Sequence, residues 1–208
     1  MEPTEELADL LSPPTLTPGA RRILEVASDL FYRGGLHAVG VDTIAAESGV
    51  TKRTLYDRFG SKDGLIRAYL QLRHQRWWER MQRRVNQAPG SPILALWDSY
   101  TLDAEPSDRG CAFINAAGEL PEDHPARDVI RAHKRAVLDL LTELLRRSRG
   151  PVDDAESTAR QIFLLLEGGM SQRGIDGDDH MLRSGREVVE HLLDLTPPEA
   201  GPGSRADS

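Results

Sequence analysis

Apolar residues recur at three- and four-residue spacing along most of the chain, and this period restricts the fold more than any other feature. Ile23, Leu24, Ala27, Leu30 and Phe31 are the first such run. This spacing is typical of amphipathic helices. β-Branched alternation and Asn-Gly hairpin signals are absent. The sequence therefore predicts an all-α protein of about nine helices.

Prolines and glycines mark where the predicted helices begin and end. The first helix begins at Pro18, after the N-cap residue Thr17, and ends at Gly34-Gly35. The other helices are predicted over 41–48, 52–58, 61–87, 91–103, 110–119, 125–149, 155–173 and 178–195. Residues 1–17 and 196–208 are rich in proline with acids or with Gly and Ser, and both are predicted to be disordered tails.

Residues 41–59 form the pattern of a helix-turn-helix, which is two short helices joined by a tight turn that contains glycine. Gly49 supplies the turn, and Val50 and Leu55 anchor the second helix in the core. The outward side chains of the second helix are all hydrogen-bond donors, namely Thr51, Lys52, Arg53, Thr54 and Tyr56. Such a surface suits a helix that lies in the major groove of DNA.

The net charge of −7 argues against a nucleic-acid-binding protein, but its distribution does not. Residues 19–86 hold 13 Lys and Arg against 7 Asp and Glu, which gives +6. Residues 87–208 hold 13 bases against 22 acids, which gives −9. A basic head on an acidic body indicates that only the head contacts nucleic acid.

From Arg22 to Lys62 the chain resembles the TetR family of bacterial transcriptional regulators. The matching positions are Arg22, Ile23, Leu24, Leu30, Phe31, Gly35, Ile44, Ala45, Gly49, Val50, Leu55, Tyr56, Phe59, Ser61 and Lys62. The resemblance implies a DNA-binding domain over 18–64 and a helical ligand-binding and dimerisation domain over 65–195. It also implies a homodimer, a double-stranded palindromic operator as partner, and a small-molecule effector.

Individual residues take roles from this resemblance. Tyr56 and Lys62 match positions that contact DNA phosphates, and Lys52 and Thr54 match positions that face the groove. Two residues depart from the pattern. Gly40 stands where the family often has a capping Ser or Thr, and Arg53 stands where a small residue is common. Arg53 has the chemistry to reach guanine, so a changed base preference is expected.

The dimer surface is predicted on the last two long helices, where the family places its four-helix bundle. Apolar and small residues form stripes there, and the same stripes are also compatible with the protomer's own core. The predicted interface residues are Ile162, Leu165, Leu166, Gly169, Val188, Val189 and Leu192.

A cavity for a small apolar or amphipathic effector is predicted inside the body helices. Its candidate lining residues are Trp77, Trp97, Tyr100, Phe113, Asn115 and Phe163. By resemblance, the effector moves the long helix over 61–87 and releases DNA, which makes a repressor the favoured function. The sequence does not decide between a repressor and an activator.

Other classes of function find less support. The chain has no HExxH, GxSxG, P-loop or dinucleotide motif, so no enzyme, cofactor or metal site is expected. It has no apolar run of about 18 residues and no signal-peptide pattern, so a cytoplasmic protein outside the membrane is expected. Two alternatives remain open. Cys111, two residues from Arg109, is a candidate redox switch, or the protein binds small molecules without operator function.

Overall fold

A computed structural model describes residues 5–104, 109–148 and 154–193, and every regular element within them is an α-helix. The ten helices are α1 (Glu5–Leu11), α2 (Pro18–Gly34), α3 (Val41–Ser48), α4 (Lys52–Phe59), α5 (Lys62–Gln87), α6 (Pro92–Ala104), α7 (Ala112–Glu119), α8 (Ala126–Arg147), α9 (Ala155–Asp176) and α10 (His180–Leu192). None of these described helices is long and apolar enough to cross a membrane. The predicted all-α class is confirmed.

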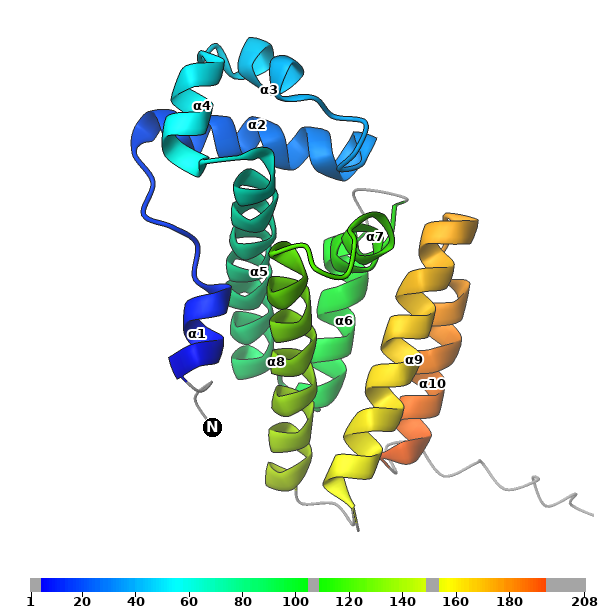
Figure 1. The fold of residues 1–208 in the computed structure, drawn as a ribbon. Helices are drawn as coiled ribbons and strands as arrows, with labels where there is room; N and C mark the ends of the chain where they lie inside the picture. The colour runs from blue at the N-terminus through cyan, green and yellow to red at the C-terminus, as the bar shows by residue number, and fades with distance from the viewer. Residues whose placement is uncertain (1–4, 105–108, 149–153, 194–208) are drawn as a thin grey trace, which may run out of the picture.

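Helices α2, α3 and α4 form a small head at one end of a bundle, and α5 runs from the head into the body (Figure 1). Within the body, α5 packs against α6 and α8, while α9 packs against α8 and α10. Helices α9 and α10 lie side by side at the edge of the molecule (Figure 1). The long helix α5 therefore belongs to both parts, since it begins beside the head and continues through the body.

The helix starts in the head follow from local capping. Thr17 Oγ1 accepts a hydrogen bond from the Ala20 N–H (3.4 Å), with Pro18 at the first helical position. Ser61 Oγ accepts one from the Gly64 N–H (2.9 Å) at the start of α5. These signals are local in sequence, and the predicted bounds of α2, α3, α4 and α5 agree with the structure to within about one residue.

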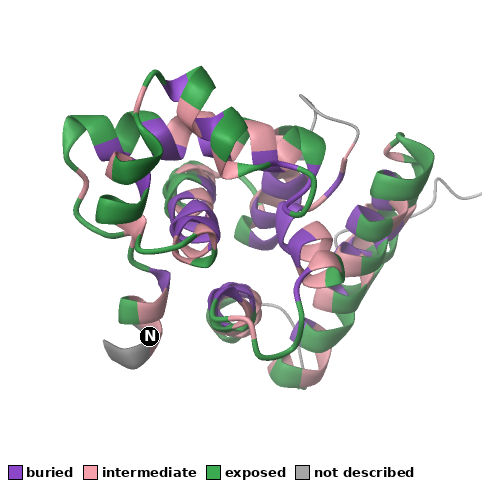
Figure 2. Ribbon diagram, turned by 45° about the horizontal axis from the view of Figure 1, so that its top comes forward, coloured by how far each residue is buried: buried purple, intermediate pink, exposed green. Residues whose placement is uncertain are grey.

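Buried apolar side chains form two clusters that share α5 and α8. Figure 2 shows where buried residues lie along the helices. The first cluster joins the head, through Ile23, Ile44 and Leu55, to Leu65 and the residues that follow it on α5. The second joins the far half of α5 to α6, α8, α9 and α10. Because the first cluster runs from head to body without a break, the domain boundary at 64/65 stays a prediction.

The N-terminal segment corrects one expectation. Disorder was predicted over 1–17, but residues 5–11 form α1, which packs on α5 and α8. Leu11 is buried, and the Gln71 amide donates to the Leu10 carbonyl at 2.9 Å. The physical reason is the spacing of Leu7, Leu10 and Leu11, which gives one short apolar face. The predicted tail over 196–208 lies outside the described residues.

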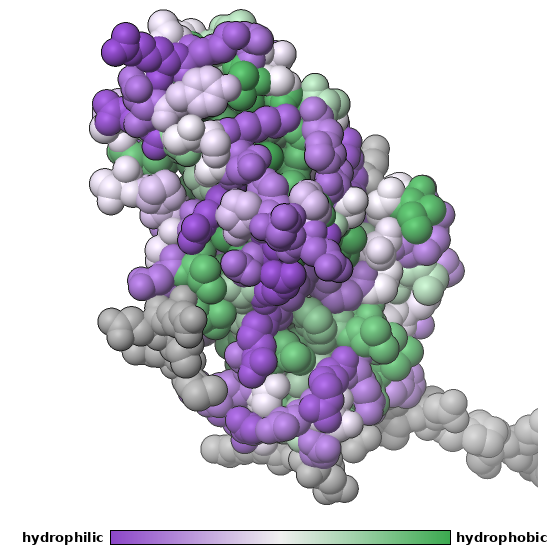
Figure 3. Space-filling view, in the orientation of Figure 1, coloured by the Kyte–Doolittle hydropathy of each residue, from purple (hydrophilic) through white to green (hydrophobic). Residues whose placement is uncertain are grey.

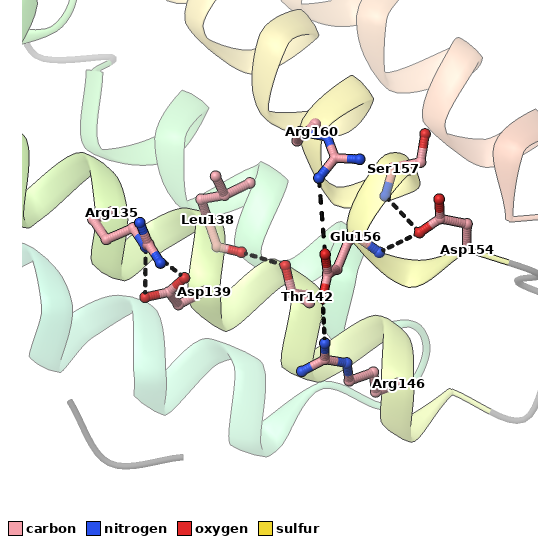
Figure 4. A network of polar contacts seen from close by, with 9 residues as sticks. All are labelled: Arg135, Leu138, Asp139, Thr142, Arg146, Asp154, Glu156, Ser157 and Arg160. Atoms are coloured by element: carbon pink, nitrogen blue, oxygen red, sulfur yellow. Dashed lines mark hydrogen bonds and ion pairs between the residues drawn. The ribbon is translucent and has the colours of Figure 1, made fainter. Parts of the chain in front are cut away.

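Polar contacts connect the end of α8 to the start of α9 at the far end of the body (Figure 4). Arg146 and Glu156 form an ion pair at 2.7 Å, and the Asp154 carboxylate accepts the Glu156 and Ser157 N–H groups. All of these groups are exposed, so their contribution to stability is small. The Arg146–Glu156 pair joins the two helices, whereas the Asp154 bonds cap the start of α9.

Candidate nucleic-acid interface and effector cavity

The turn between α3 and α4 has the geometry that a helix-turn-helix requires. Gly49 has a φ of 70°, in the left-handed region where glycine is favoured, and the Val50 N–H donates to the Ala45 carbonyl at 3.2 Å. Ile44 and Leu55 are completely buried and hold the two helices against each other. The orientation of α4 is therefore fixed by packing, and its other face is free to meet a partner.

The exposed face of α4 carries the predicted DNA-contacting side chains. Arg53 has 92% of its side chain exposed, and the Tyr56 ring is also exposed. Lys52 forms an ion pair with Asp42 of α3, and this hydrogen bond raises the pKa of Lys52, so the ammonium stays charged. Thr51 Oγ1 accepts the Thr54 N–H at 3.2 Å, so one predicted contact residue also caps the helix.

Lys62 lies apart from this face, in the first turn of α5. Its Nζ donates to the His37 carbonyl in the α2–α3 loop at 3.4 Å. Gly40, at the start of α3, forms no side-chain capping bond, and a Cβ placed on it would meet nothing within 4 Å. The space that a capping hydroxyl would occupy is therefore open.

Helix α7 connects the head to the body through its last residue. Glu119 Oε2 accepts the backbone N–H groups of Leu36 (2.6 Å) and His37 (3.0 Å), both in the α2–α3 loop. His37 Nε2 also lies 2.6 Å from the Glu119 carbonyl oxygen. At the other end of α7, Tyr32 of α2 donates to the Gly110 carbonyl at 3.0 Å. Both ends of α7 thus hold the head.

A cavity of about 320 Å³ lies beside α2 and among the body helices. Four aromatic side chains form one wall, namely Trp77, Tyr100, Phe113 and His133. The Phe113 and His133 rings stack with centroids 3.8 Å apart, and the Trp77 and Tyr100 rings meet edge to face at 5.0 Å. The geometry of this wall suits a flat apolar group.

Five charged side chains also line the cavity, three on α5 and one each on α2 and α6. Arg73, Arg76 and Arg80 of α5 line the cavity together with Asp29 and Asp103. Arg80 and Arg84 both contact the Asp103 carboxylate, at 3.2 and 3.0 Å. Arg76 contacts Glu25 at 3.6 Å, and the Arg73 guanidinium lies 4.0 Å over the Tyr32 ring. The cavity is therefore amphipathic, with an aromatic wall and a cationic edge.

Two buried histidines join α5 to α8 next to the cavity. His74 Nδ1 and His133 Nδ1 are 2.9 Å apart, so one ring donates a hydrogen and the other accepts it. Burial lowers the pKa of His74 to about 4 and lowers the pKa of His133 well below its usual value. Both imidazoles are therefore neutral at pH 7.

This histidine pair predicts a loss of stability in acid. Between about pH 6.5 and 4 the unfolded chain binds a proton at His74 and the folded chain does not, so unfolding becomes easier as pH falls. For His74 alone, the free energy of unfolding is expected to be about 2 kcal/mol lower at pH 5 than at pH 7.5. Urea unfolding at both pH values measures it. His74→Gln should reduce the drop and the exposed His180→Gln should not; equal drops in all three proteins would contradict the assignment.

The structure brings three of the six predicted pocket residues to the cavity, which are Trp77, Tyr100 and Phe113. Trp97 is not on the lining, because it is 1% exposed within the core and lies against Gly185 of α10. The Asn115 amide donates to the Arg109 carbonyl at 2.7 Å, and Phe163 packs on the second apolar cluster. The prediction missed several lining residues, namely Asp29, Tyr32, Arg73, Cys111 and His133. Charged residues such as Asp29 and Arg73 are usually exposed, and Tyr32 lies in the head rather than in the body helices.

Much of the predicted dimer stripe also needs correction. Ile162, Leu166, Gly169 and Val189 are buried inside the protomer, and a Cβ on Gly169 would meet Leu182 at 2.7 Å. Leu165 is half-buried against the same core. Val188 and Leu192 are exposed in the protomer, and so are three other large apolar side chains, namely Leu164, Ile175 and Met181. Leu164 and Ile175 were not among the predicted interface residues. Figure 3 shows apolar surface on the α9 side of the molecule.

The exposed apolar residues define a surface that we call the outer stripe: Leu164, Gly168, Ser171 and Ile175 on α9, and Met181, Val188 and Leu192 on α10. The α9 members recur at three- and four-residue spacing and so share one face of the helix. A Cβ on Gly168 would meet nothing within 4 Å, unlike one on Gly169. The two adjacent glycines therefore have different surroundings, one facing solvent and one the core.

The head presents a helix-turn-helix with an exposed polar recognition helix, and the helical body beside it lines a cavity. This combination defines a DNA-binding protein of the bacterial regulator type. The sequence model described as "Bacterial regulatory proteins, tetR family" matches residues 23–69. SCO4454, a TetR-family transcriptional regulator from Streptomyces coelicolor, is 32% identical to this chain, with a TM-score of 0.76 over 85% of this chain and 95% of that one. The chain belongs to the TetR family of transcriptional regulators.

Two further relatives agree with this assignment. A TetR transcriptional regulator of Streptomyces avermitilis is 26% identical, with a TM-score of 0.71 over 86% of this chain and 99% of that one. The HTH-type transcriptional activator FasR of Mycolicibacterium smegmatis is 47% identical over 50 residues. That alignment spans 24% of this chain and 23% of FasR, so it covers less than a quarter of either protein.

Proposed function

We propose that this protein is a dimeric cytoplasmic repressor that binds a palindromic operator and is released from it by a small molecule in the cavity. The observation that carries the proposal is the exposed polar face of α4, presented by a head whose core fixes its orientation. The basic charge of residues 19–86 supports the same contact, because phosphates attract it.

The proposal divides the head's side chains into two groups. Tyr56 and Lys62 contact phosphates and so supply affinity for any DNA, whereas Arg53 contacts a base and supplies selectivity. Lys52, Thr54 and Thr51 complete the contact surface. For Lys52, binding exchanges the Asp42 carboxylate for a phosphate or a base.

Selection of bound sequences from a random DNA pool tests the function, because a dimer enriches a palindrome with half-sites about 34–36 Å apart. Variants then test the division of roles by gel shift on the selected site and on random DNA. Tyr56→Phe and Lys62→Ala should weaken both complexes similarly, whereas Arg53→Ala should lower affinity for the selected site by about 5- to 150-fold and change the preferred base. Equal losses on both DNAs for all three variants would refute the division, and no enrichment would refute operator binding.

The outer stripe is the proposed dimer surface. Its apolar residues are exposed in the protomer and lie on the last two helices, where two copies would form a four-helix bundle. Gly168 and Ser171 at its centre would let the facing helices approach closely. Two heads held by one such bundle would read two half-sites, which matches the palindrome that the proposal expects.

The cavity supports the effector part of the proposal. Its lining includes Ser28, Asp29 and Tyr32 of α2 in the head together with residues of α5 and α7. An occupant therefore touches the head directly, and any shift of α2 or α5 moves α4. A difference in effector affinity of about 1–3 kcal/mol between the DNA-bound and released forms would change operator affinity about 5- to 150-fold.

A second candidate is control by oxidation of Cys111. Lys134 Nζ lies 3.6 Å from Cys111 Sγ, and an adjacent ammonium group is typical of reactive cysteines. Lys134 also forms a half-buried ion pair with Glu167 at 2.6 Å, which holds the ammonium in place. Rapid labelling of the thiol, with loss of DNA binding after peroxide that Cys111→Ser abolishes, would favour this candidate. A thiol that does not react would exclude it.

A further inference from the structure

We infer that the cavity takes a compact aromatic carboxylate, whose anionic end contacts Arg73 and whose ring lies against the wall of Trp77, Phe113 and His133. The inference rests on the proposed function, because it names the chemical class of the effector that the proposal assigns to this cavity.

The first step is the balance of charge on the lining. Three arginines of α5 have a carboxylate partner: Asp103 contacts Arg80 and Arg84, and Glu25 contacts Arg76. Arg73 is half-buried and forms no ion pair with any residue that the structure describes. A partly desolvated guanidinium without a carboxylate is a favourable partner for an anionic ligand.

The second step is the orientation of Arg73. Its guanidinium stacks over the Tyr32 ring with a distance of 4.0 Å to the centroid. Stacking occupies one face of the planar group and leaves the N–H donors at its edge, which match the two oxygens of a carboxylate. Tyr32 is itself held by its hydrogen bond to the Gly110 carbonyl, so the platform beneath Arg73 is fixed.

The third step concerns the hydroxyl group of Tyr100 in the aromatic wall. Tyr100 is 95% buried, since its exposed fraction is 5%, and its hydroxyl has no hydrogen-bond partner among the described residues. Burial also raises the pKa of Tyr100, so this hydroxyl keeps its proton and is a donor. A second polar group on the ligand, able to accept a hydrogen bond, would satisfy it.

Size and shape restrict the class further. A volume of about 320 Å³ lies at the lower end of the range for ligand cavities, which favours a molecule of one or two rings over a long acyl chain. The stacked Phe113 and His133 rings and the Trp77 indole favour a flat ring over a branched aliphatic body. Asp29 is the other charged lining group that forms no ion pair with a described residue. It is exposed to water and so is a weaker anchor for a cationic ligand.

Three probes of similar shape and different charge test the inference. They are 3-(4-hydroxyphenyl)propionate, its neutral primary amide, and the amine 2-(4-hydroxyphenyl)ethylamine. Isothermal titration calorimetry with the full chain should show the acid binding at least about 10-fold more tightly than the amide or the amine. The inference is overturned if the amine binds most tightly, if the three probes bind alike, or if the acid does not bind at about 10 mM.

Variants of the protein test whether Arg73 contacts the anionic end of the ligand. Arg73→Gln should lower affinity for the acid at least about 10-fold and leave the amide unchanged, whereas Arg73→Lys should keep part of the preference for the acid. Arg83→Gln is the matched control, because Arg83 is an exposed arginine of α5 that does not line the cavity. Tyr100→Phe should weaken the acid and the amide equally. Equal effects of Arg73→Gln and Arg83→Gln, in proteins with unchanged thermal unfolding, would overturn the assignment of Arg73.

Gel shifts with the same probes separate this inference from the proposed function. Binding of the acid with the expected selectivity, but without an effect on operator affinity, would support the ligand class and overturn the effector role. Operator binding that is relieved by other compounds, while the acid does not bind, would overturn the ligand class and support the proposed function.

Discussion

Val188→Arg is expected to leave the protomer folded and to lower affinity for a palindromic operator by about 100- to 10,000-fold. Val188 is 46% exposed on the outer stripe of α10, so arginine there meets water in the protomer and an apolar surface in the proposed dimer. A charge buried without a partner in an apolar interface opposes association strongly. Two linked heads bind far more tightly than one head alone, so the loss of the dimer removes most of the affinity.

Two neighbouring residues provide controls for this prediction. Glu187 is exposed and points about 100° away from Val188 around the helix, so Glu187→Arg should leave both the dimer and operator binding intact. Val189 is completely buried, and Val189→Arg is expected to unfold the protein rather than to release a folded monomer. Sedimentation and circular dichroism distinguish the three outcomes. A Val188→Arg protein that remains dimeric would exclude the outer stripe as the interface.

Helices α9 and α10 show what sequence can and cannot predict. Helical period identifies apolar positions on α9 and α10, but it does not say which of two apolar faces meets the protomer's own core. Ile162 and Leu166 were predicted at the interface and lie inside the protomer, whereas Leu164, between them in sequence, is exposed. The choice depends on how α9 is rotated against α8 and α10, which is a property of the tertiary structure.

The head could be predicted almost completely because its signals are local. Thr17, Gly49, Thr51 and Ser61 each act on residues within about four positions, so helix bounds follow from the sequence itself. The cavity depends on side chains that come together from six helices. Arg73 in particular resembles any surface arginine until α2 brings Tyr32 beneath it.

Replacing Glu119 is expected to uncouple the cavity from the head. Its carboxylate accepts two backbone N–H groups of the α2–α3 loop, at 2.6 and 3.0 Å. The start of α7 contributes Ala112 and Phe113 to the cavity lining, so one eight-residue helix touches both the occupant and the head. A displacement of Phe113 by a ligand would reach the α2–α3 loop through Glu119.

Glu119→Ala should therefore have two measurable effects. It leaves the Leu36 and His37 N–H groups without their acceptor, which should lower the free energy of unfolding by about 1–3 kcal/mol and the melting temperature by about 2–10 °C. It should also reduce the effect of ligand on operator affinity from about 5- to 150-fold to about 2-fold or less, because the contact that carries the motion is gone.

The two effects require separate controls, since a destabilised protein can lose its response for trivial reasons. Glu122→Ala removes an exposed acid near the end of the same helix and should change neither quantity. Glu119→Gln keeps one oxygen that can accept a hydrogen bond, so its stability should lie between those of Glu119→Ala and the natural protein. Ligand affinity measured by calorimetry should stay within about 3-fold of normal in all three variants, because Glu119 does not line the cavity. A Glu119→Ala protein that binds ligand normally and still releases operator normally would show that the signal reaches the head through α2 and α5 instead.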